Sequence, residues 1–173
     1  MVQFMEPEPQ PGPKVARERD AIRFVRSWID DRPWHLWLVG ILSLLWNSFG
    51  ALDYTMSQLH NRAYLGSAAA SMGISAEEMI AFIDSFPGWM HGLWALGVWG
   101  ALLGSILLLI RHRFAVWSFA ASLFGLAATQ LYQASVPQPE WMETAVPMTV
   151  AIWSIASFLL IYAISMRRKG VLR

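Results

Sequence analysis

Four long stretches of the chain contain no charged residue. They cover residues 34–52, 88–110, 114–133 and 148–166. A helix needs about 20 residues to cross a hydrocarbon core of about 30 Å, and each stretch is near or above that length. Backbone amides in lipid must find partners within their own segment, and the strands of membrane barrels are much shorter than these stretches. The pattern therefore predicts an all-α protein with four membrane-spanning helices.

The composition agrees with a membrane location. Of the 173 residues, 55% are hydrophobic and 14% are charged, whereas about a quarter of a soluble domain is charged. This excludes a water-soluble globule and makes the lipid bilayer the first expected partner. The absence of cysteine excludes disulfides and thiolate metal sites, and a net charge of +1 gives no reason to expect a nucleic-acid partner.

The basic residues predict how the chain is oriented. Lys and Arg number six, one, two, none and four in the five segments that flank the spans, in chain order. The positive-inside rule places the richer segments in the cytoplasm. Both termini are therefore expected there, and Arg62 is the one basic residue on the other side.

The segments outside the spans differ in character. Residues 1–13 are rich in proline, which predicts a disordered tail. Residues 14–33 predict an amphipathic, basic helix on the inner leaflet, with a merely solvated stretch as the alternative. Residues 167–173 form a basic cytoplasmic tail, and residues 53–87 form an extracytoplasmic loop that is expected to be helical.

Small or polar residues recur along the first span at steps of three and four. They are Gly40, Ser43, Asn47, Gly50, Tyr54, Ser57, Asn61 and Tyr64. Because the pattern continues beyond residue 52, it predicts one helix that projects from the membrane and ends near Gly73. A second helix is expected to start at Ser75, which forms a capping pair with Glu78, and to stop before Pro87.

Each span carries a narrow face of small residues, which predicts a left-handed antiparallel bundle of the four helices spanning residues 34–166. Gly100 and Gly104 form a Gly-x-x-x-Gly motif, and the third and fourth spans carry serines at helical spacing. The residues expected to pack helix against helix are Gly40, Ser43, Gly50, Gly97, Gly100, Gly104 and Gly125.

Polar residues in a span are costly and are candidates for function. Asn47 and Gln130 lie within spans, and Asp53, Tyr54, Tyr132 and His91 lie near the outer margin. An outward-opening ligand pocket is one interpretation, and hydrogen bonds that fix helix register are the other. The pocket would be formed by Asn47, Tyr54, Trp94, Gln130 and Tyr132.

Other chemistry has weak support. No serine lies in a nucleophile turn or beside paired carboxylates, so no catalytic residues are assigned and no enzyme activity is expected. His60 and His91 are weak candidates for a haem or copper site, with ordinary interfacial histidines as the alternative. No cofactor is expected.

Several motifs resemble a family of bacterial four-helix inner-membrane proteins, sometimes labelled "sugar transporter". The resemblance covers roughly residues 34–173. The motifs are Trp46-Asn47-x-x-Gly50-x-x-Asp53-Tyr54, Asn61-x-Ala63-Tyr64-Leu65, Phe86-Pro87-x-Trp89, Gly100-x-x-x-Gly104-Ser105, Leu107-Leu108-Leu109 with Arg111 and Arg113, and Gly170-Val171-Leu172-Arg173. The resemblance implies the four-helix fold and the bacterial inner membrane, and it implies no particular cargo.

These observations favour a non-enzymatic membrane protein that packs against copies of itself or against a larger membrane complex through its glycine and serine faces. One alternative is an oligomeric transporter or binder of a small neutral solute, which could be a sugar. A second alternative is a redox protein that carries haem or copper.

Overall fold

The computed structural model describes residues 17, 19, 21, 22 and 33–173, except the side chains of residues 143–145. The chain divides into two compact units, residues 1–34 and 35–173. The expected proline-rich tail over residues 1–13 lies outside the described residues. So does most of the expected amphipathic helix over residues 14–33, of which residues 17, 19, 21 and 22 are described and helical.

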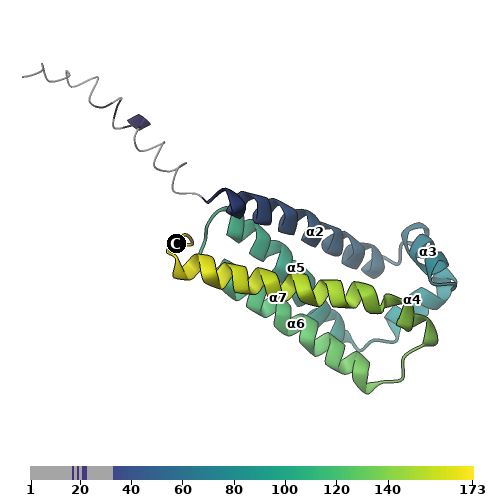
Figure 1. Cartoon of the computed structure of the whole chain (residues 1–173). Coiled ribbons are helices and arrows are strands. Elements are labelled where there is room, and N and C mark those ends of the chain that lie inside the picture. Colours follow the sequence, from purple (N-terminus) through teal and green to yellow (C-terminus); the bar gives the residue numbers. More distant parts are fainter. Residues whose placement is uncertain (1–16, 18, 20, 23–32) are drawn as a thin grey trace, which may run out of the picture. The chain divides into compact units, whose positions relative to one another are not determined.

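The described part of the chain is all-α, which confirms the predicted fold class. Four of its helices are long and apolar enough to cross a membrane, and each runs antiparallel to the next span along the chain (Figure 1). The spans are α2 (Trp34–Gln58), α5 (Gly88–Leu109), α6 (Ala115–Ser135) and α7 (Val146–Arg168). The shorter elements are α3 (Arg62–Ser71), α4 (Ala76–Asp84) and the 3-10 helix η1 (Glu140–Ala145).

The two ends of this bundle are built differently. One end holds the turn between α5 and α6, with Arg111 and Arg113, and the last turn of α7, with Arg167 and Arg168. We call it the arginine end. The opposite end carries the helical hairpin of α3 and α4, and we call it the hairpin end (Figure 1).

The first span does not continue to Gly73, so the prediction of one projecting helix is wrong. Helix α2 ends at Gln58, because His60 adopts a left-handed φ of 49°. The amide of Asn61 then bonds back to Met56 O, which closes a Schellman motif. The Asn61 side chain accepts a hydrogen bond from the Tyr64 amide at 3.0 Å and so starts α3 as a separate helix.

The rest of the hairpin follows its sequence signals. Gly73, with φ 75°, terminates α3, and the Ile74 amide bonds to Ala69 O in a second Schellman motif. Ser75 and Glu78 form the predicted capping box at the start of α4, which ends at Asp84 before Pro87. The expected second helix between Ser75 and Pro87 is therefore confirmed.

The end of the chain pairs with the turn between α5 and α6. Arg173 donates its amide to Arg111 O at 2.8 Å, and the Arg113 amide donates to Arg173 O at the same distance. Arg111 Nε also donates to Val171 O at 3.0 Å. Leu172 is buried against the bundle, so the last residues brace the arginine end.

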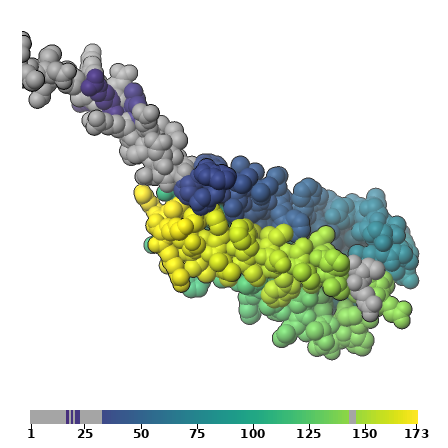
Figure 2. Space-filling model, viewed as in Figure 1, coloured from purple at the N-terminus to yellow at the C-terminus, as the bar shows by residue number. Residues whose placement is uncertain are grey.

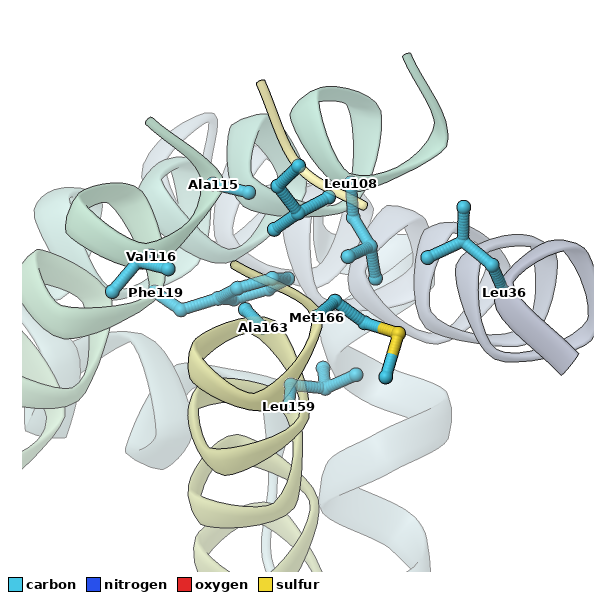
Figure 3. Packing of buried hydrophobic residues seen from close by; sticks show 9 residues of the cluster. Leu36, Leu108, Ala115, Val116, Phe119, Leu159, Ala163 and Met166 are labelled. Carbon is cyan, nitrogen blue, oxygen red and sulfur yellow. The ribbon is translucent and has the colours of Figure 1, made fainter. Parts of the chain in front are cut away.

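All four spans contribute to a packed core at the arginine end (Figure 3). Its buried side chains interdigitate around Phe119 of α6, which is almost fully enclosed. The core residues are Leu36, Leu108, Ala115, Val116, Phe119, Leu159, Ala163, Met166 and Leu172. A second, smaller cluster lies between the hairpin helices and consists of Leu65, Ala69, Met79 and Ile83.

Candidate functional site

Helices α5 and α6 make the closest contact in the described bundle, and glycine makes it possible. A Cβ atom on Gly125 would lie 2.6 Å from Leu93 O and 2.7 Å from Gly97 N, both backbone atoms of α5. On α5, a Cβ on Gly104 would lie 2.8 Å from the Phe119 ring, and one on Gly100 would lie 3.3 Å from Ser118 O. Any side chain at these positions would push the two helices apart.

Serine hydroxyls of α6 reinforce this contact. Ser118 Oγ donates to Gly100 O at 2.8 Å, and Ser122 Oγ donates to Gly97 O at 2.5 Å. The glycine face of α5 is therefore covered by α6 of the same chain. This corrects the expectation that this face joins separate copies, because another copy cannot occupy a surface that α6 already fills.

The packing glycines of α2 behave differently from one another. Gly40 lies against α5, where a Cβ would collide with the side chain of Leu109, and Ser43 is buried one turn later. Gly50 has open space around it, because a Cβ there would meet no atom within 4 Å. The α2 face that carries Gly50 therefore borders open space, whereas Ala51 and Ser57 of the same helix are buried and Gln58 contacts His91 of α5 at 3.0 Å.

The space beside Gly50 is a cavity of about 530 Å³. It lies among the four spans and beneath the hairpin, within residues 35–173. Phe119 and Leu159 of the packed core form its floor, and Tyr64 and Met72 of α3 lie at its opposite end. The remaining lining residues are Trp46, Asn47, Phe49, Gly50, Asp53, Trp94, Gly97, Val98, Ala101, Ser122, Leu126, Thr129, Met148, Ile152, Ile155 and Ala156.

Helices α2 and α7 lie next to each other on the face shown in Figure 2, and both contribute lining residues to the cavity. Phe49 of α2 lines the cavity and is 69% exposed, and Met148 of α7 lines it and is 57% exposed. Near the arginine end the two spans meet, with His35 Nδ1 2.6 Å from Tyr162 Oη, whereas beside Phe49 and Met148 the cavity lining includes exposed side chains of both spans. In a bilayer the cavity would therefore open sideways toward lipid.

Asn47 lies near the middle of α2, beside the cavity and in hydrogen-bond contact with α5. It lines the cavity, and its Nδ2 donates to Ser105 Oγ at 2.9 Å and toward Ala101 O at 3.4 Å. The Ser105 hydroxyl donates its own hydrogen bond to Ala101 O at 2.9 Å. The amide group thus clamps α2 to α5 at the edge of the cavity.

Asp53 and Tyr64 provide the polar group at the hairpin end of the cavity. Tyr64 Oη donates to Asp53 Oδ1 at 3.1 Å. Burial raises the pKa of the Tyr64 phenol, and the neighbouring carboxylate raises it further through its charge and this hydrogen bond. Tyr64 therefore remains protonated and donates to the carboxylate at neutral pH.

The break after α2 creates this pair. In one continuous helix, residues eleven positions apart would be separated by about 16 Å along the axis. The turn at His60 folds α3 back, so that Tyr64 reaches Asp53 over the mouth of the cavity. Sequence reasoning placed Asp53 at the membrane margin but did not assign it to the site, because it assumed an unbroken helix.

The five predicted pocket residues separate into two groups. Asn47 and Trp94 line the cavity, and Tyr54 packs edge-on against Trp94 with ring centroids 5.1 Å apart. Gln130 and Tyr132 are not among the described lining residues. Gln130 bonds to Gln133, and Tyr132 packs edge-on against Trp89 near the end of α6.

The two candidate histidines have separate partners. His60 Nε2 lies 2.9 Å from Asp84 Oδ1, and His91 Nδ1 lies 3.0 Å from Gln58 Nε2. Within residues 33–173 and the few described before them, no three or more metal-ligating side chains gather in one place.

Helix α7 contributes to the site although the sequence assigned none of its residues there. Five of its apolar residues line the cavity.

Comparison of the chain with protein-family models, with curated proteins and with solved structures finds no match. The resemblance to the four-helix inner-membrane family therefore stays a prediction, of which the structure bears out the four spanning helices. By the length and composition of those helices, the chain is a multi-pass membrane protein.

Proposed function

We propose that this protein binds a small, largely apolar molecule from the bilayer and catalyses no reaction on it. The cavity carries this proposal. Its volume of about 530 Å³ is that of a small-molecule site, and its lining is mainly aliphatic and aromatic. The packed core closes one end and the α3–α4 hairpin covers the other, so the open side between α2 and α7 is the route for a ligand.

The bilayer in this proposal is the bacterial inner membrane, with the arginine end in the cytoplasm. The described basic residues support this orientation, because Arg111, Arg113 and the cluster from Arg167 to Arg173 lie at one end, whereas Arg62 lies in the hairpin. Under the positive-inside rule the hairpin then lies outside the cytoplasm. A ligand would reach the cavity from the outer half of the bilayer.

A sugar fits this cavity less well than an apolar molecule does. Each buried sugar hydroxyl needs a hydrogen-bond partner, and an unpaired one is costly. The polar side chains in the lining are few, and Asn47, Ser122 and Thr129 already donate to neighbouring groups. A haem or copper role has less support still, because His60 and His91 are engaged with Asp84 and Gln58.

An accessory role in a larger membrane complex is the weaker alternative. It depended on free glycine faces, and those of α5 and α6 are turned toward each other. The serine face of α7 remains, where Ser154 is exposed and its hydroxyl donates to Val150 O of the same helix. Nothing about that face indicates a particular partner.

The test is to fill the cavity without disturbing the helix contacts. Gly50→Leu places a side chain in the cavity, and Gly92→Leu is the matched control, since both glycines lie in spanning helices with open space around them. The probe is phenylnaphthylamine, a neutral dye that becomes fluorescent in apolar surroundings, added to the purified protein in maltoside micelles.

We expect Gly50→Leu to weaken dye binding by about tenfold or more, which corresponds to a loss of about 1.4 kcal/mol. Gly92→Leu should bind the dye as the unaltered protein does. Equal binding by all three proteins, after correction for dye in empty micelles, would show that the cavity is not the binding site.

A further inference from the structure

Asp53 places an exposed, unbalanced charge at the hairpin end of the cavity. Asp53 is the only charged side chain among the described lining residues. Among the described residues the ion pairs join His60 to Asp84 and Arg62 to Glu77, and neither involves Asp53. Tyr64 donates to Oδ1 and leaves Oδ2 with no protein partner in the described structure. An exposed carboxylate at the end of a mostly apolar cavity can pair with the cationic group of a ligand whose apolar part occupies that cavity.

Aromatic rings surround the same cavity. Trp46 lies on the face of α2 that also carries Asp53, two turns away, and Trp94 and Tyr64 line the cavity from α5 and α3. The faces of such rings attract cations, and alkylated ammonium groups are the ligands that combine best with aromatic walls. The rest of the lining is mainly apolar and reaches Phe119 and Leu159, with Asn47 and Ser122 among its few polar side chains.

We infer that the ligand of this cavity is an amphiphile with an alkylammonium head group, which is held by Asp53, and an apolar tail, which extends toward Phe119 and Leu159. This inference rests on the proposed function and adds the chemical class of the ligand. Tyr64 fixes the orientation of the carboxylate through its hydrogen bond. The sideways opening beside Phe49 and Met148 allows an amphiphile to keep its tail in lipid while its head group approaches Asp53.

The experiment compares two competitors that differ in charge. Octyltrimethylammonium and octanol have the same chain length, and each is used to displace phenylnaphthylamine from the protein in maltoside micelles, which carry no charge and no ammonium group. We expect the cation to displace the dye at a concentration at least about tenfold lower than the alcohol, after correction for the different partitioning of the two into empty micelles.

Two charge-removing substitutions assign that preference to a residue. Asp53→Asn should abolish the advantage of octyltrimethylammonium over octanol, and an unchanged helix content by circular dichroism shows that the variant is folded. Glu77→Gln removes a charge from the exposed surface of the hairpin, outside the cavity lining, and should leave the advantage unchanged.

The outcomes separate this inference from the proposed function. If the dye binds and is displaced equally by the two competitors, or if Asp53→Asn keeps the preference for the cation, the head-group assignment is overturned while the cavity remains a binding site. If the dye does not bind at all, the proposed function fails first. Added phosphatidylcholine identifies the source of the head group: displacement of the dye indicates a lipid, whereas displacement by octyltrimethylammonium alone indicates a free amphiphile.

Discussion

The arginine end and the hairpin end of the bundle use the same helices in opposite ways. At the arginine end all four spans converge on Phe119, and Leu108, Ala115 and Ala163 have no exposed surface. Toward the hairpin end α5 and α6 remain in contact through glycine and α2 touches α5 through Tyr54 and Gln58, but the Gly50 face of α2 borders a cavity. The four-helix bundle is therefore tightly packed at the arginine end and contains a cavity toward the hairpin end.

This difference separates the residues that hold the helices together from those that are available to contact a ligand. Large side chains give the arginine end its rigidity, and backbone contact between Gly97 and Gly125 holds α5 and α6 together beside the cavity. Helix α2 is fixed to α5 by the Asn47 hydrogen bond and to α3 by the Asp53–Tyr64 hydrogen bond, and its Gly50 face borders the cavity between these two points. Each prediction below changes one side of this comparison.

Truncation of the packed core should have the largest effect. Leu108→Ala removes a fully buried side chain and should lower the free energy of unfolding by about 2–4 kcal/mol. Leu126→Ala makes the same change in the cavity wall, where it enlarges an existing space, and should cost less than about 1 kcal/mol. Titration with dodecyl sulfate in maltoside micelles measures both, and equal losses would contradict a difference in packing.

The contact between α5 and α6 should be nearly as sensitive. Gly125→Ala adds a methyl group that would lie 2.6 Å from Leu93 O, so the helices must separate, and we expect a loss of about 1–3 kcal/mol. Alanine is otherwise the better helix former by about 1 kcal/mol, and Gly92→Ala, in open space, should be neutral or stabilising. A stabilised Gly125→Ala variant in the same titration would refute the close contact.

The clamp between α2 and α5 should contribute less. Asn47→Leu removes the hydrogen bond to Ser105 Oγ, and we expect a loss of about 1 kcal/mol, as is usual for a bond between membrane helices. Ser105 keeps its own bond to Ala101 O, so no new unsatisfied donor appears. Ser48→Ala, on the exposed side of α2, is the control. Equal free energies of unfolding for the two variants would show that the Asn47 hydrogen bond does not stabilise the bundle.

The hairpin should respond to acid. Hydrogen bonds from the Ser75 amide and hydroxyl lower the pKa of Glu78 below its usual value of 4.5. The stabilising effect of the capping box is therefore complete above pH 4.5 and is lost as the pH falls through the lowered pKa. Hydrogen exchange at the first amides of α4 should accelerate over that range relative to a Glu78→Gln variant, and parallel profiles would exclude the capping carboxylate as the cause.

The spans and the hairpin caps could be predicted because their signals are local. Uncharged length places α5 within a residue of its predicted bounds, and Ser75 with Glu78 marks the start of α4 directly. The break at His60 could not be predicted, because a non-glycine residue with left-handed φ has no sequence signature. Asn61 caps α3 and could have indicated the break, but it also fitted the heptad spacing of the first span.

The cavity could not be predicted, because it depends on distances between helices. Gly50 and Gly125 are alike in sequence, yet one faces open space and the other faces the backbone of α5. Asn47 and Trp94 were placed in the site because polar and aromatic residues in a span are conspicuous. The apolar residues of α7, such as Ala156, differ in no visible way from residues that face lipid.

The most direct test of a bundle that is solid at one end and hollow at the other is one substitution made twice on α7. Ala156 lines the cavity, and Ala163, two turns later on the same face, is fully buried in the packed core. A phenylalanine at residue 163 has no room and should lower the free energy of unfolding by about 3 kcal/mol. Ala156→Phe should change the free energy of unfolding by less than about 1 kcal/mol, because the ring enters the cavity, and should prevent the dye from binding there. Equal destabilisation by Ala156→Phe and Ala163→Phe, with dye binding unaffected, would contradict the account.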